Sequence, residues 1–495
     1  MCVLFMAQSR MTTLVSRAEI EEAREQIEKS GAPQQASDIR FQHTLASRFV
    51  FLIVCSTVVL SALAYGTVHY WALAVFSLGA LAVLALWLID GWQLGFLRIS
   101  RNSLQLPLVG MLVLGLVQLL PLRSSNVGGG LSLPAVRSLS LDPYSTRLVL
   151  VQVMALLIYF GATLVFTDTP HRLRLLVRTI TIFGFLLAIF GLTQSFTSPN
   201  RVYWMRELGQ STAFGPFINR HHFAGYMELT IALPLGLIFA GSVDRDKKFV
   251  YLFAAGLMGV ALMMTASRGG IISLVAEVVF LAAIAGLRNG QHRHEERGRR
   301  RAAGAAVRAA LALALIVALF AGVVLLGGEG ALSRFVGTVN SDDPTTGRAH
   351  FWSVTVDIIK AHPIIGMGLG AFGLVYTRYD SRNGLFRLEQ AHNDYLQVLS
   401  DGGIVGAALA LFFVVVLFRK AFARGESRDD FRRGVCMGAM AGCFAVLVHS
   451  FFDFTLHTTS NALLFLILAG LATLNGRVER PRRRRRRYRQ RSSRQ

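Results

Sequence analysis

Long apolar segments, almost free of charged residues, are the feature that most constrains what this chain can fold into. A helix of about 20 residues crosses the ~30 Å hydrocarbon core of a bilayer, in which every backbone polar group must be hydrogen-bonded within the chain. The sequence therefore predicts an all-α integral membrane protein with about 12 transmembrane helices. The segments lie near residues 49–66, 70–89, 104–122, 146–167, 175–195, 222–241, 249–266, 269–287, 306–326, 402–418, 434–452 and 460–475.

The distribution of Lys and Arg predicts the orientation, because loops on the cytoplasmic side carry the excess of positive charge. With the N-terminus inside, alternate loops hold 38 of the 51 Lys and Arg residues. Both termini are therefore expected in the cytoplasm. The expected order is an N-terminal tail (1–47), helices 1–9 (48–326), a long outer loop with short helices (327–401), helices 10–12 (402–476) and an Arg-rich tail (477–495).

The net charge of +22 raises the alternative of nucleic-acid binding, which the run Arg482–Arg487 would favour. A basic cytoplasmic tail that enforces topology and contacts anionic lipid headgroups explains the same charge. We interpret the tail in this second way and expect no nucleic-acid partner.

Polar residues that can carry chemistry are concentrated at the outer boundary of the predicted helices. Two arginines suit a diphosphate, because guanidinium groups bind phosphate oxygens in pairs and stay charged. A histidine can take or give a proton near neutral pH. The candidates come from four separate stretches of the chain: Arg220, His221 and His222; Arg268; Arg348; and His392 with Asn393.

The two central arginines also have structural interpretations. Arg268 could place its charge at the membrane surface from a helix end, beside a Gly269-Gly270 turn. Arg348 could pair with Asp342 or Asp343 on a solvated loop.

The histidines have structural alternatives as well. His392 with Asn393 could cap a helix, and His221 with His222 could mark a helix boundary. No third ligand has a spacing suited to a metal, so no metal site is expected.

A glycine-rich stretch divides the long outer loop. His362-Pro363, followed by Gly366, Gly368 and Gly370, predicts a helix, a turn and a flexible segment. The stretch follows no predicted strand and precedes no P-loop lysine, which argues against a nucleotide site.

Several of these motifs together resemble the O-antigen ligase and polymerase superfamily. The resemblance extends over about residues 210–476 and depends on the order and spacing of the motifs rather than on any single one. They are Thr265–Gly270, Gly347–Trp352, His362–Gly368, His392–Leu396 and His449–Asn461.

The resemblance implies a multi-pass glycosyltransferase of the bacterial inner (cytoplasmic) membrane that acts on the periplasmic face. Such proteins move a glycan from undecaprenyl diphosphate to an acceptor without a metal or a nucleotide sugar. We expect no cofactor, and a direct displacement would invert the anomeric carbon. The acceptor is lipid A–core for ligases, a lipid-linked glycan for polymerases and a protein for some relatives.

The family's functional residues correspond to positions in this chain. By resemblance, the catalytic set is Arg268, Arg348 and His392. The residues expected to contact substrate are Arg220, His221, His222 and Asn393.

Two other classes of protein share parts of this pattern. A transporter, such as a flippase of lipid-linked oligosaccharide, also has many helices and a basic interior side, but it would place charges inside its membrane core. Here Glu228 and Glu277 are the main acids within the predicted helices. A non-catalytic assembly protein would have no need for two arginines and a histidine to converge.

Overall fold

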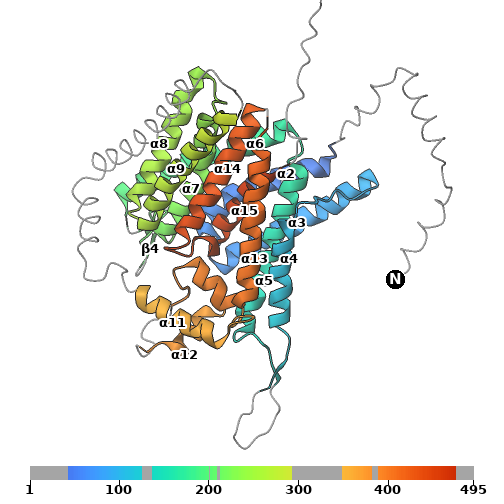
Figure 1. Cartoon of the computed structure of the whole chain (residues 1–495), viewed down its shortest axis with the longest axis vertical. Helices are drawn as coiled ribbons and strands as arrows, with labels where there is room; N and C mark the ends of the chain where they lie inside the picture. The colour runs from blue at the N-terminus through green and yellow to red at the C-terminus, as the bar shows by residue number, and fades with distance from the viewer. Residues whose placement is uncertain are drawn as a thin grey trace, which may run out of the picture. The chain divides into compact units, whose positions relative to one another are not determined.

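A computed structural model describes residues 43–124, 136–199, 201–208, 212–291, 348–381, 388–427 and 429–474. Residues 46–495 form one compact unit, and the description below concerns its described part. Helices make up most of its described residues, and Figure 1 shows most of these helices running side by side.

The helices, in chain order, are α2 (Leu45–Leu63), α3 (Tyr70–Leu94), α4 (Gln105–Gln118), α5 (Pro143–Phe166), α6 (Pro170–Thr197), α7 (Arg220–Phe239), α8 (Lys248–Met264), α9 (Arg268–Gln291), α11 (Arg348–Ala361), α12 (Phe372–Tyr379), α13 (Asp394–Arg424), α14 (Asp430–His449) and α15 (Thr459–Thr473). Short 3-10 helices are η1 (Tyr65–Thr67), η2 (Arg245–Lys247) and η3 (Thr455–His457). Two antiparallel pairs of very short strands join β1 (Arg123–Ser124) to β2 (Val136–Arg137) and β3 (Arg201–Val202) to β4 (Arg206–Glu207).

The all-α membrane class is confirmed. Within the described ranges, nine helices are long and apolar enough to cross a membrane, and α4 and α15 are shorter apolar helices. Eleven of the twelve predicted segments therefore coincide with a helix. The remaining segment, 306–326, lies outside the described residues, so the total of twelve stays a prediction.

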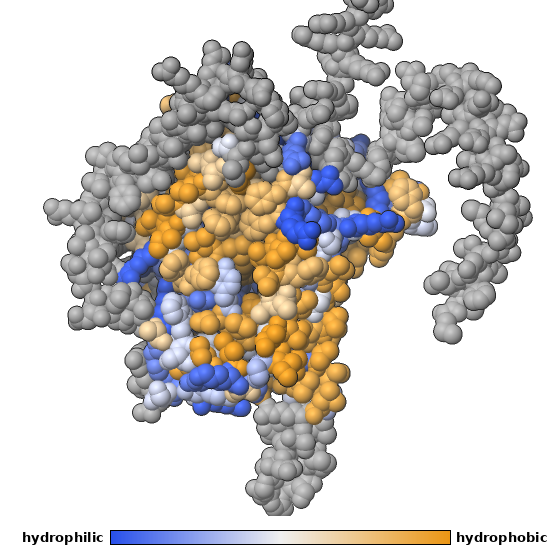
Figure 2. All heavy atoms as spheres, in the orientation of Figure 1, coloured by the Kyte–Doolittle hydropathy of each residue, from blue (hydrophilic) through white to orange (hydrophobic). Residues whose placement is uncertain are grey.

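Burial separates central helices from peripheral ones. Helices α7 and α14 are mostly buried and every residue of α15 is buried, whereas α3 turns Trp71, Val75 and Leu78 outward. Outward-facing apolar side chains are what a lipid environment requires of a peripheral helix. On the face shown in Figure 2, hydrophobic residues cover most of the helical bundle.

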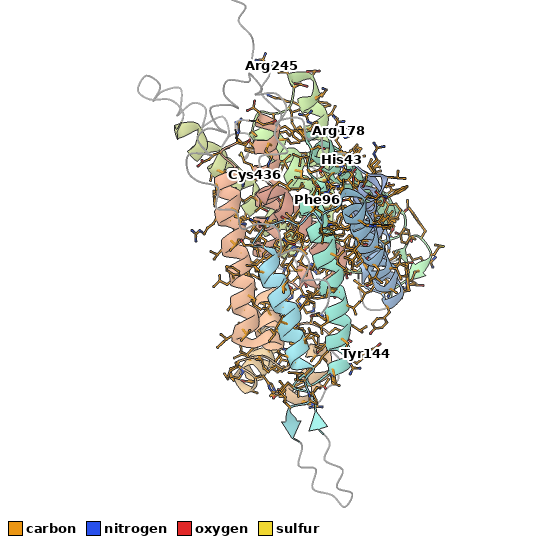
Figure 3. The ribbon with its side chains drawn as sticks, turned by 90° about the vertical axis from the view of Figure 1, so that its right-hand side faces the viewer. His43, Phe96, Tyr144, Arg178, Arg245 and Cys436 are labelled. Carbon is orange, nitrogen blue, oxygen red and sulfur yellow. The ribbon has the colours of Figure 1, made fainter. Side chains whose placement is uncertain are left out.

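The two ends of the bundle differ in their residues. Figure 3 shows Arg178 and Arg245 toward one end and Tyr144, at the start of α5, toward the other. The second end also carries α11 and α12. The segment between these two helices is bonded to the residues just before α5, because Leu141 N donates to Met367 O at 2.9 Å. The segregation of basic residues between the two sides of the membrane, and the side on which each end lies, stay predictions.

The described part of the long loop contains the expected short helices, α11 and α12, on either side of Pro363. Helix α13 begins at Asp394, inside the predicted loop, and continues through a break at Gly403 (φ 60°). The apolar run starts only near this break, which explains why hydropathy predicted a helix from residue 402.

The glycine-rich stretch is fixed rather than flexible, which corrects the expectation from its composition. The amides of Met367 and Gly368 donate to backbone carbonyls of α13, at 2.9 and 3.2 Å. The amide of Leu369 donates to Gln118 and that of Gly370 to Asp401, at 2.9 and 3.0 Å. These amides are committed to structural hydrogen bonds and cannot cradle a phosphate.

Close helix packing gives a testable consequence. A Cβ at Gly236 of α7 would lie 2.4 Å from the Cα of Gly438 of α14, whereas a Cβ at Gly256 of α8 would meet nothing within 4 Å. We expect Gly236→Ala to destabilise the protein by about 1–3 kcal/mol through overpacking, and Gly256→Ala to leave it nearly unchanged. Thermal unfolding of the purified protein in detergent measures both; equal losses of stability would contradict this packing.

Candidate functional site

The connection between α14 and α15 (residues 450–458) forms the centre of the candidate site. It turns tightly after α14, since the amides of Phe452 and Asp453 both donate to His449 O, at 2.7 and 3.1 Å. The turn directs the Asp453 side chain inward, where only 1% of it is exposed.

Three basic side chains surround the Asp453 carboxylate. His392 Nδ1 lies 3.0 Å from Oδ1. His221 Nδ1 and Arg348 Nη2 lie 3.6 and 3.7 Å from Oδ2. The backbone amide of Phe454 also donates to Oδ1, at 2.9 Å. We call Asp453, His392, His221 and Arg348 the Asp453 cluster.

This environment determines the ionisation of Asp453. Burial by itself would raise the pKa of its carboxyl, but the hydrogen bond from His392 and the charges of His221, His392 and Arg348 outweigh burial and hold the pKa well below its usual range. An ionised carboxylate only accepts hydrogen bonds, so His392 Nδ1 must be the donor. When the His392 ring is neutral, its proton is therefore on Nδ1, and Nε2 is the atom that can accept a proton.

Four helices begin around this cluster. They are α7 at Arg220, α9 at Arg268, α11 at Arg348 and α13 at Asp394, so three of the four open with an arginine. Helix N-termini carry partial positive charge and unpaired amides, and they favour anions. The combination of arginines and helix N-termini makes this end of the bundle suited to an anionic group.

Ser267 links the start of α9 to the cluster. Its Oγ accepts a hydrogen bond from Gly270 N at 3.2 Å, which caps α9, and lies 2.8 Å from His221 Nδ1. Arg268, the next residue, is partly buried. The cap therefore fixes both His221 and the base of the Arg268 side chain.

Two residues beside these caps have strained backbones. Ala266 and His392 have φ angles of 51° and 52°, in the left-handed region that non-glycine residues seldom adopt. Each directly precedes the residue that caps a helix, Ser267 or Asn393. Such strain persists only where surrounding contacts impose it, and it is concentrated at functional sites.

The structure brings Arg348, His392 and the start of α9, which carries Arg268, to one turn. Arg348 Nη1 donates to the carbonyl of Phe452, and His392 bonds to Asp453. Gly269, next to Arg268, packs against Phe452, where an added Cβ would lie 2.9 Å from the Phe452 Cβ. The alternative partners of Arg348, Asp342 and Asp343, lie outside the described residues.

The predicted substrate residues at the start of α7 divide into two groups. His221 belongs to the cluster, and Arg220 precedes it with its amide bonded to Thr212 O at 2.9 Å. His222 points elsewhere: it is buried with its ring edge-on to Phe454, whose ring also contacts His392. Phe454 therefore lies between His222 and His392.

Asn393 has the structural role that the sequence left open. Its Oδ1 accepts from the amides of Tyr395 and Leu396, at 3.0 and 3.1 Å, and caps α13. Its Nδ2 donates to Phe451 O at 3.2 Å. These bonds anchor the start of α13 to the 450–458 connection, and a contact between Asn393 and substrate stays a proposal.

Sequence reasoning assigned no role to Asp453 or Ser267. Both occur in the motifs that carry the family resemblance, His449–Asn461 and Thr265–Gly270, which was the available signal. Among the described residues, no group of three or more His, Cys, Asp and Glu side chains has an arrangement that could hold a metal ion.

These features define a class of protein: a multi-pass helical membrane protein with an arginine- and histidine-rich site at one end of its bundle. Residues 253–411 match a family model described as O-antigen ligase, a segment that includes Arg268, Arg348 and His392. This match supports the resemblance to the O-antigen ligase and polymerase superfamily that the motifs indicated. The comparison with curated proteins found no match.

The capping role of Asn393 predicts a specific stability pattern. We expect Asn393→Ala to lower the free energy of unfolding by about 0.5–2 kcal/mol, because the first amides of α13 lose their acceptor. Asn393→Ser keeps a capping oxygen and should lose less. Thermal unfolding of the two purified variants tests this, and an equal stability of Asn393→Ala and wild type would contradict the cap.

Proposed function

We propose that this protein is a membrane glycosyltransferase that moves a glycan from an undecaprenyl-diphosphate carrier to a hydroxyl of an acceptor at the periplasmic face. The observation that carries the proposal is the Asp453 cluster, in which one buried carboxylate contacts the Nδ1 atom of a histidine and lies beside an arginine. The match of residues 253–411 to the O-antigen ligase family model supports the reaction class.

The arginines would bind the diphosphate of the donor. Arg268 and Arg348 open two helices whose N-termini meet at the Phe452–Asp453 turn, and Arg220 opens a third nearby. Negative charge grows on the diphosphate as its bond to the sugar breaks, and preorganised guanidinium groups and helix N-termini stabilise that charge. Arg348 gives one donor to Phe452 O and keeps other N–H groups for a ligand.

His392 would act as the general base. The acceptor oxygen attacks the anomeric carbon, its proton passes to His392 Nε2, and the bond between the anomeric carbon and the diphosphate oxygen breaks with both electrons leaving on the diphosphate. A single displacement of this kind inverts the anomeric centre. Asp453 fixes the required tautomer and stabilises the imidazolium that forms, as an orienting carboxylate does in hydrolase triads.

The polar groups are distributed in a way that favours an enzyme over a flippase. The arginines that open helices lie at one end of the bundle, and the core acid Glu228 is paired with His449 at 2.8 Å. A flippase that carries a diphosphate across the membrane would need basic side chains along the route through the core.

Surface polysaccharide provides the test of function. A deletion strain is complemented with wild type, Arg348→Ala, His392→Ala or, as a matched control, Arg245→Ala, whose side chain lies exposed at the opposite end. We expect Arg348→Ala and His392→Ala to lose the wild-type surface polysaccharide and Arg245→Ala to keep it.

The pattern of the loss distinguishes two activities. Loss of long glycan on lipid A with accumulation of lipid-linked polymer identifies a ligase, whereas loss of chain length with single units still transferred identifies a polymerase. Wild-type gels from both site variants would contradict the proposal.

The role of Asp453 gives a quantitative prediction. Asp453→Asn keeps the size of the side chain but no longer requires a proton on His392 Nδ1, so the base is held in the wrong tautomer for part of the time. We expect kcat to fall by about 10²–10⁴ with a smaller change in the KM for donor. A transfer assay with purified protein and lipid-linked glycan measures this, and an unchanged kcat would remove Asp453 from the mechanism.

A further inference from the structure

A second pair of charged residues lies beneath the candidate site, inside the bundle. Glu228 of α7 and His449 of α14 are both fully buried, and His449 Nδ1 lies 2.8 Å from Glu228 Oε1. Neither Glu228 Oε2 nor His449 Nε2 has a hydrogen-bond partner within the described part of the chain. The proposed reaction uses neither residue.

Such a pair is poorly explained by stability. Burying charged groups costs several kcal/mol each, and the attraction between them compensates only when their remaining polar atoms are also satisfied. Here one polar atom of each residue, Glu228 Oε2 and His449 Nε2, has no hydrogen-bond partner among the described residues. Buried pairs of this kind are better explained by the geometry that they impose on their neighbours.

The ring of His449 contacts the first turn of α9. A Cβ at Gly269 would lie 2.6 Å from His449 Cδ2 and 2.9 Å from its Nε2, so only glycine permits this approach. Gly270 is similarly close to α7, where a Cβ would lie 2.9 Å from the Ala224 Cβ. The start of α9, and with it Arg268, therefore rests directly on the buried pair.

The backbone of His449 holds the other half of the site. Its carbonyl accepts the amides of both Phe452 and Asp453, at 2.7 and 3.1 Å. Phe452 O in turn binds Arg348. His449 thus contacts the residue after Arg268 through its ring and orients the partners of Arg348 through its carbonyl.

We propose that the Glu228–His449 pair is a positioning device that sets the separation of the two diphosphate arginines, Arg268 and Arg348. The inference rests on the proposed function and extends it to residues that do not contact substrate. Glu228 locks the rotation of the His449 ring through Nδ1, and the ring then sets how closely α9 approaches the Phe452–Asp453 turn. A bidentate site for a diphosphate depends on this spacing.

Binding of farnesyl diphosphate, a short prenyl diphosphate, to the purified full-length protein tests the inference. Gly269→Ala inserts one methyl group between α9 and the His449 ring, and we expect it to weaken binding by roughly 10- to 100-fold, the effect of a misplacement of about 1 Å. Gly286→Ala is the matched control on the same helix, because a Cβ there meets nothing within 4 Å. Glu228→Gln, which keeps the shape and an acceptor but loses the charge, should weaken binding less than Gly269→Ala does.

A double variant separates positioning from general damage. His449→Asn retains a donor near the position of Nδ1. It removes two of the three atoms nearest to the Gly269→Ala methyl, His449 Cδ2 and Nε2, and leaves the third, the Phe452 Cβ. We therefore expect Gly269→Ala combined with His449→Asn to bind farnesyl diphosphate more tightly than Gly269→Ala alone. General damage to the fold would instead make the two losses add.

The outcomes distinguish this inference from the proposed function. If Arg268→Ala and Arg348→Ala abolish binding while Gly269→Ala and Glu228→Gln bind as wild type does, the positioning role is wrong and the proposed function stands. If the two arginine variants bind as wild type does, the proposed function itself is wrong. If His449→Asn gives no recovery of Gly269→Ala, the positioning role is also overturned.

Discussion

The contact between Asp453 and His392 is the interaction on which the rest of the site depends. A carboxylate that is 1% exposed needs compensating partners, and it finds them in His392, His221 and Arg348. Those partners come from α7, α11 and the start of α13, so satisfying one buried charge draws three distant parts of the chain together. In the proposed mechanism, the same contact orients His392 for proton transfer.

The sequence predicted the membrane fold well, because the requirement to bury backbone polar groups in lipid acts on each segment separately. Every predicted segment within the described ranges coincides with a helix. Hydropathy failed where a helix continues beyond the apolar run, as at the start of α13, where Asp394, Gln397 and Asp401 look like a loop. It also gave no sign that hydrogen bonds would fix the glycine-rich stretch.

The sequence predicted which residues form the candidate site, but not which side chains contact one another. Arg268, Arg348 and His392 followed from motif resemblance. The structure places Arg348, His392 and Gly269, the residue after Arg268, at one turn. The partner of His392 is 61 residues away, and tertiary packing rather than local pattern determines such a pair. The cap at Asn393 was among the structural alternatives because capping is a local interaction that the sequence can indicate.

The most direct test of the central claim is an experimental structure of the full-length protein with undecaprenyl diphosphate bound. Our account predicts that the guanidinium groups of Arg268 and Arg348 both lie within hydrogen-bond distance of the diphosphate, and that His392 Nε2 faces the position vacated by the sugar. A diphosphate bound away from the Phe452–Asp453 turn, with His392 turned from it, would contradict the account.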